Sequence, residues 1–151
     1  MILDERTEFA DATSVGTPNN TTVNVGDIID LGITGRDVGN GQPLYLVIQV
    51  TTTIASAGSA IVEFLLSSDS TSTIAVDGTQ TIHYRSDYFA VAVLVAGYQL
   101  VVPIPAGSPT FERYLAFQIR ETGSQALNAG NVNAFLTLDP NGWKAYPDAT
   151  N

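Results

Sequence analysis

Residues 115–138 read LAFQIRETGSQALNAGNVNAFLTL, and apolar side chains occupy every second position at both ends of this stretch. In 115–120 one face takes Leu, Phe and Ile, and the other takes Ala, Gln and Arg. In 131–138 a row of Val, Ala, Leu and Leu alternates with Asn, Asn, Phe and Thr. Because successive side chains of a strand point to opposite faces of a sheet, this period of two predicts a β-strand in each segment.

The rest of the chain extends this pattern. The β-branched residues that fit a pleated surface are abundant, with 17 Thr, 14 Val and 11 Ile. Glycine-containing turns separate the apolar runs, and Asp77-Gly78 between two short runs predicts a β-hairpin. Further strands are expected at 28–33, 44–53, 60–67, 74–76, 79–84 and 98–104.

Many short strands without helices between them predict an all-β fold, an antiparallel β-sandwich of the jelly-roll type. The 151 residues suit a single domain, with a sandwich over 21–138. Residues 1–20 and 139–151 fall outside the strand pattern, and we expect them to form extended N- and C-terminal arms.

Composition excludes several classes of function. The chain has no Cys and a single His, His83, so thiolate sites and multi-histidine metal sites are excluded. A net charge of −9 with six Lys and Arg makes nucleic acid and anionic membranes poor partners. The longest apolar run, 89–96, is far shorter than the ~20 residues that span a bilayer.

Catalytic chemistry is weakly indicated. His83 is expected to be a hydrogen-bonded strand histidine at a sheet edge rather than a general base. A glycosidase needs two opposed carboxylates, and Glu63, Glu112 and Glu121 are candidates without a predicted separation. Alternation with Val62 and Phe64 favours a solvent-facing Glu63. We therefore expect no enzyme.

Metal and cofactor sites are also weakly indicated. The segments 67–70 and 139–142 offer oxygen ligands, but neither carries a complete calcium loop. We expect no bound metal and no cofactor.

Several apolar residues need cover that strand alternation does not supply. Both faces of 44–50 are apolar, and Phe135 lies opposite the Val-Leu row of its strand. Trp143 and Tyr146 lie in the C-terminal arm. Either the arms fold back over their own sandwich, or these residues contact another subunit.

Three stretches resemble the cement, or decoration, proteins of tailed-bacteriophage capsids. The first is Asp30-Leu31-Gly32 followed by 35–47, GRDVGNGQPLYLV. The second is Arg113-Tyr114-Leu115 with Thr122-Gly123, and the third runs from 133–136 through 138–139 to Ala145-Tyr146-Pro147. The Met-Ile-Leu-Asp start is similar too, whereas the middle, about 53–97, matches least.

This resemblance implies a jelly-roll virion protein without a cofactor. It would form homo-oligomers, with a dimer favoured, and lie on the outer surface of the assembled head, bridging neighbouring subunits of the major capsid protein. We expect the contacts at apolar arm residues, Tyr45 and two arginines that would pair with carboxylates of a partner or within the chain. These residues are Ile2, Leu3, Phe9, Arg36, Tyr45, Arg113, Trp143 and Tyr146.

Two other functions remain open at this stage. A carbohydrate-binding, lectin-like jelly roll would display clustered exposed aromatic side chains for stacking on sugar rings. A small hydrolase would need a pair of carboxylates that face each other.

Overall fold

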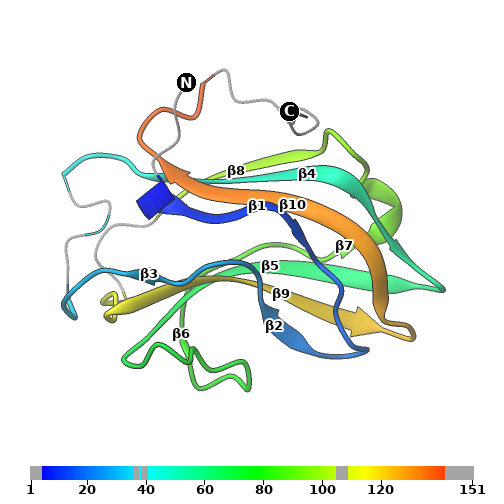
Figure 1. The fold of residues 1–151 in the computed structure, drawn as a ribbon, viewed down its shortest axis with the longest axis horizontal. Helices are drawn as coiled ribbons and strands as arrows, with labels where there is room; N and C mark the ends of the chain where they lie inside the picture. The colour runs from blue at the N-terminus through cyan, green and yellow to red at the C-terminus, as the bar shows by residue number, and fades with distance from the viewer. Residues whose placement is uncertain (1–4, 36–37, 39–40, 105–108, 142–151) are drawn as a thin grey trace.

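A computed structural model describes residues 5–35, 38, 41–104 and 109–141. Two antiparallel sheets pack face to face as a sandwich (Figure 1). The four-stranded sheet has the order β1 (Glu8–Ser14), β10 (Leu127–Thr137), β4 (Tyr45–Ser56) and β8 (Gln99–Pro103). The six-stranded sheet has the order β2 (Thr22–Asn24), β9 (Tyr114–Gly123), β5 (Ala60–Asp69) and β6 (Thr81–Arg85).

Short elements complete the structure. β3 (Ile29–Asp30) pairs with β9, and β7 (Phe89–Ala90) pairs with β5. Two 3-10 turns, η1 (Glu5–Thr7) and η2 (Val91–Val93), precede β1 and follow β7. The all-β antiparallel sandwich is therefore confirmed. The jelly-roll type stays a prediction, which the frequent crossing of the chain between the two sheets supports.

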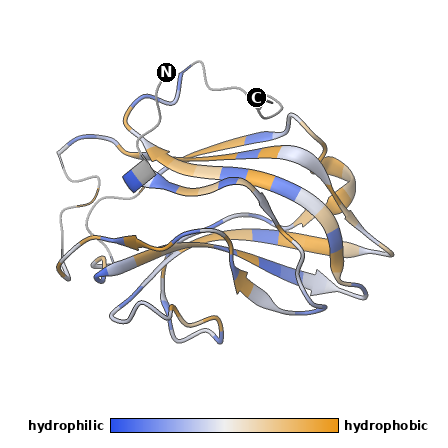
Figure 2. Cartoon of the chain, viewed as in Figure 1, coloured by the Kyte–Doolittle hydropathy of each residue, from blue (hydrophilic) through white to orange (hydrophobic). Residues whose placement is uncertain are grey.

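The core lies between the sheets. Figure 2 shows hydrophobic, orange stretches along the strands of both sheets. Phe64 of β5 and Phe117 of β9 stack with ring centroids 5.9 Å apart, and both are fully buried. Opposite them, Leu46 and Ile48 of β4 are also fully buried in the same cluster. Phe117 belongs to the row Leu115, Phe117 and Ile119, which the alternation in 115–120 assigns to one face of β9.

The first strand corrects the predicted N-terminal arm. Residues 8–14 form β1 at the edge of the four-stranded sheet, so the sandwich begins well before residue 21. Phe9 is 1% exposed, and its carbonyl accepts a hydrogen bond from the Asp27 N–H at 2.6 Å. At Gly26, φ is +74° and a Cβ would lie 1.8 Å from that carbonyl oxygen, so glycine is required there.

The predicted hairpin at Asp77-Gly78 is wrong in part. β6 is present, but 74–76 is not a strand. The Asp77 carboxylate instead accepts hydrogen bonds from the Thr79 N–H at 3.1 Å and the Thr79 hydroxyl at 2.7 Å, which closes a local turn. Residues 70–80 thus form a loop that packs on the six-stranded sheet through Ile74, which is 2% exposed.

Both faces of β4 are covered within the single chain. Val47 of β4 and its β10 partner Phe135 are 0% and 1% exposed, although neither belongs to the core cluster between the sheets. The apolar face that we noted in the sequence therefore does not need a second subunit. Leu138, just after β10, is 55% exposed.

Candidate functional site

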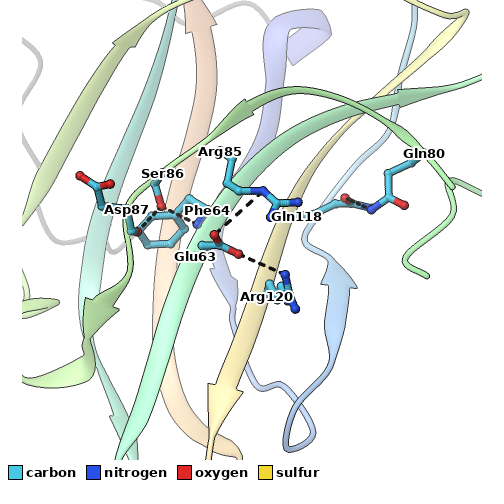
Figure 3. A network of polar contacts seen from close by, with 8 residues as sticks. All are labelled: Glu63, Phe64, Gln80, Arg85, Ser86, Asp87, Gln118 and Arg120. Atoms are coloured by element: carbon cyan, nitrogen blue, oxygen red, sulfur yellow. Dashed lines mark hydrogen bonds and ion pairs between the residues drawn. The ribbon is translucent and has the colours of Figure 1, made fainter. Parts of the chain in front are cut away.

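A buried carboxylate lies between two arginines on the outer face of the six-stranded sheet (Figure 3). The Glu63 side chain is only 3% exposed. Its Oε1 lies 4.0 Å from Arg85 Nε, and its Oε2 lies 3.6 Å from Arg120 Nη1. Burial of a charge is unfavourable unless it is paired, so the two guanidinium groups explain how Glu63 is tolerated here.

Strand register brings these three residues together. Glu63 of β5 lies directly opposite Arg120 of β9, and Leu65 of β5 lies opposite Arg85 of β6. Because Glu63 and Leu65 are two positions apart, Arg85 reaches the same face. The expectation that Glu63 faces solvent is wrong: Glu63 lies on the outer face that alternation assigns to it, but it is buried there beside two arginines.

The end of β6 is fastened beside Glu63. The Ser86 hydroxyl accepts a hydrogen bond from the Phe64 N–H at 2.9 Å and donates one to the Asp87 carbonyl at 2.7 Å (Figure 3). The Ser86 N–H donates to the Phe64 carbonyl at 2.9 Å. These bonds fix the backbone next to Arg85.

A network of amides attaches the 70–80 loop to the sheet. Gln118 of β9 is fully buried, and its Nε2 donates to Asn24 Oδ1 and to the Ala75 carbonyl, both at 2.8 Å. Its Oε1 accepts from Gln80 Nε2 at 3.2 Å. Asn24 Nδ2 in turn donates to the Ile74 carbonyl at 3.1 Å. The loop is therefore held over the sheet at two backbone positions.

This loop, the turn before β2 and the two arginines enclose a pocket of about 400 Å³. Ligand sites are typically about 300–1,000 Å³. Three residues of the lining, Leu65, Val76 and Ile82, are aliphatic. The other lining residues are Asn20, Thr21, Thr22, Asp77, Gly78, Gln80, Arg85 and Arg120.

The single histidine is a buried structural residue of β6, the edge strand of its sheet. His83 Nε2 lies 2.7 Å from Ser68 Oγ, and the imidazole stacks on Phe111 with centroids 3.8 Å apart. Burial lowers the pKa of His83 to about 4, although nearby Glu112 opposes that shift. Ser68 is 0% exposed and accepts a hydrogen bond from the Glu112 N–H at 3.0 Å, so its hydroxyl is inaccessible to a substrate.

The three candidate carboxylates do not converge. Arg120 shares a face with Glu63, so Glu121, the next residue of β9, points to the other face. Glu121 Oε2 accepts a hydrogen bond from the Asn20 N–H at 2.5 Å. Glu112 lies beside Ser68, five positions along β5 from Glu63 and hence roughly 17 Å away. Its Oε1 accepts from the Thr81 hydroxyl at 2.6 Å. No pair here has a glycosidase arrangement.

The acidic loop at 67–70 is satisfied by its own chain. The Asp69 carboxylate accepts hydrogen bonds from the N–H groups of Thr71 and Ala75, both at 3.1 Å. The Ala75 bond is the main reason that the pKa of Asp69 is lowered. Within the described ranges, no three His, Asp or Glu side chains gather as metal ligands. The same ranges contain no helix long and apolar enough to cross a membrane.

A family model described as Bbp16 matches residues 9–136, which include nearly all of both sheets and the whole lining of the pocket. The chain belongs to the Bbp16 family. A search of curated proteins finds no match for it.

The predicted interface residues of this Bbp16-family chain lie in different environments. Phe9 is not a surface anchor, because it is buried in the core of its own chain. Arg113 pairs within the chain, with Nε and Nη2 each donating to an oxygen of Asp30 at 2.9 Å. Tyr45 is half-buried at the start of β4. Five other predicted residues, Ile2, Leu3, Arg36, Trp143 and Tyr146, lie outside the described residues.

Sequence reasoning missed the Glu63–Arg85–Arg120 cluster. The available signal was alternation along β5 and β9, which assigns Glu63 and Arg120 to outward faces. Their proximity depends on the register of β5 against β9, and Arg85 comes from a third strand. The sequence contains no local indication of either pairing.

Proposed function

We propose that this chain is a structural virion protein, a capsid cement protein that binds the exterior of an assembled phage head. It bridges neighbouring subunits of the major capsid protein and thereby stabilises the shell. Cement proteins need contact surfaces rather than catalytic groups. The resemblance of three stretches, including 30–47 and 133–147, to capsid cement proteins supports this proposal.

One structural observation carries most weight. At the start of β1, Glu8 pairs with Phe135, and at the end of β10, Thr137 pairs with Tyr45. Residues 5–7 and 138–141 therefore join the sandwich side by side at one end of the four-stranded sheet. Tyr45 lies at the same end, because it pairs with Thr137, and this arrangement suits a docking end there.

Cement action follows from repetition. Contacts of modest free energy, repeated around a closed symmetric shell, give a large collective stabilisation. A homo-oligomer, with a dimer favoured, would link subunits on two sides of a seam. The protein would be made in the host cytoplasm and then join the outer surface of the virion.

The test is quantitative mass spectrometry of purified particles of the virus that encodes the chain. A copy number of the same order as that of the major capsid protein supports the proposal. Selective removal of the chain should also lower the temperature at which the particles release DNA. Absence from the particles would overturn the cement function.

The lectin-like alternative receives less support. Sugar rings commonly stack on aromatic side chains, and the lining of the 400 Å³ pocket contains none. A glycan screen of the purified chain checks this alternative directly.

A further inference from the structure

The arginines of the pocket have unused hydrogen-bonding capacity. A guanidinium group carries five N–H donors. Arg85 and Arg120 approach Glu63 at 4.0 and 3.6 Å, beyond the ~3.2 Å limit of a good N–H···O hydrogen bond. Their side chains are 46% and 38% exposed, and both line the pocket.

The cluster also carries excess positive charge. Two cations face one carboxylate, and in the described part of the chain no second acid lies within 4.0 Å of either arginine. Two of the six Lys and Arg side chains of a chain with net charge −9 thus line one pocket. Asp77 is also in the lining, but its carboxylate is engaged by Thr79.

The aliphatic part of the lining indicates which class of anion the pocket would bind. Leu65, Val76 and Ile82 supply aliphatic contact beside the arginines. A carboxylate on a short methylene stem matches this combination, because arginine binds carboxylates in a bidentate manner and aliphatic surface covers the stem.

We propose that this pocket binds the side chain of a glutamate, or of an aspartate, presented by a partner polypeptide. The partner carboxylate bridges the outward N–H groups of Arg85 and Arg120, while Glu63 holds both guanidinium groups from below. The site lies on the outer face of the six-stranded sheet and is separate from the docking end beside Tyr45. It does not depend on the partner being a capsid protein.

The test uses the full chain labelled with ¹⁵N and two blocked peptides, acetyl-Ala-Glu-Ala-amide and acetyl-Ala-Gln-Ala-amide. NMR follows the Nε–H signals of the arginines at low ionic strength. We expect saturable shifts of Arg85 and Arg120 with the Glu peptide at millimolar concentration, and at least tenfold weaker binding of the Gln peptide. Arg113, whose Nε already donates to Asp30, is the internal control. Equal effects of both peptides, or equal shifts at Arg113, would overturn the proposal.

Two variants with opposite expected effects sharpen this test. Glu63→Gln removes the competing anion and should tighten binding of the Glu peptide several-fold. The double substitution Glu63→Gln and Arg120→Gln removes one arginine without leaving an unpaired buried carboxylate, and it should abolish saturable binding. Unchanged affinity in the double variant would contradict the site.

Two further titrations complete the design. Asp77→Asn removes a negative charge from the wall and should also strengthen binding, whereas weaker binding would count against the proposal. Methyl glycosides should not compete with the Glu peptide, and competition would instead assign the pocket to sugar. Because these experiments need no particles, their failure and the failure of the cement function are distinguishable.

Discussion

Two clusters of acids and arginines lie on the same six-stranded sheet, and they differ in a way that distance alone does not reveal. Asp30 and Arg113 form a bidentate pair at 2.9 Å, with side chains that are 44% and 45% exposed. Glu63 has longer contacts, 3.6 and 4.0 Å, but is 3% exposed. Water competes at the first site and is largely excluded from the second. The longer contacts are therefore expected to matter more for stability.

The exposed pair still affects protonation. The hydrogen bond from Arg113 is the main reason that the pKa of Asp30 falls to about 2, and the Gly32 N–H adds to it. The Arg113 guanidinium also lies 5.0 Å from the centre of the Tyr114 ring. A large shift in pKa at an exposed site thus coexists with a small expected effect on stability.

The largest expected effect comes from removing both arginines around Glu63. The double substitution Arg85→Met and Arg120→Met keeps unbranched side chains over Glu63 but leaves its buried carboxylate without a cation, which should lower the free energy of unfolding by about 3–5 kcal/mol. Urea unfolding at pH 7 measures it. Adding Glu63→Gln should restore much of the loss. A loss below about 1 kcal/mol would show that burial does not distinguish the two clusters.

His83 is a buried group whose pKa is shifted mainly by burial, so it tests burial separately from ion pairing. Its folded pKa of about 4 is below the ordinary value of 6.5, so the unfolded chain takes up the proton first. Stability should therefore be complete above pH 6.5 and decline by about 1–2 kcal/mol as the pH falls to 4, less than the full shift implies because solvent screens part of it.

The check is urea unfolding of the parent and of His83→Gln at several values between pH 7 and 4. The variant should lack this component of the pH dependence, while carboxylate titration remains in both proteins. Parallel curves for the two proteins would contradict the prediction.

Glu63→Gln should have a smaller effect than loss of both arginines. The amide is nearly the same size and removes the buried charge, while Arg85 and Arg120 are already partly solvated where they line the pocket. We expect a change of about 1 kcal/mol or less in the free energy of unfolding at pH 7. A loss as large as that of the double arginine variant would mean that Glu63 is needed to neutralise the arginines rather than the reverse.

The smallest effect is expected at the exposed pair. Asp30→Asn and Arg113→Ala should each unfold within experimental error of the parent at pH 7. The contribution of Asp30 is present above its ordinary pKa of 3.8 and is lost as the pH falls toward 2. Comparison of parent and Asp30→Asn in that acid range checks the sign. A clear loss of unfolding free energy in either variant at pH 7 would contradict the proposed difference between the exposed and the buried cluster.

Sequence patterns predicted the strands whose signal is local. Alternation over 115–120 and 131–138 anticipated β9 and β10, because a period of two follows from strand geometry. The hairpin predicted at Asp77-Gly78 was wrong in part, because the same residues form a turn within a loop that packs on the sheet through Ile74. Phe9 was assigned to an arm because its segment is acidic and lacks clear alternation, yet β10 offers it an edge to pair with.

The sequence by itself determined the all-β class and excluded thiol chemistry, because strand periodicity and the lack of Cys are properties of the chain alone. Only the tertiary structure decided that Glu63 is buried and that Arg85 and Arg120 surround it. These residues meet through the registers of β5 with β9 and with β6. Register is set by packing and turns across the whole sheet, so no local pattern encodes it.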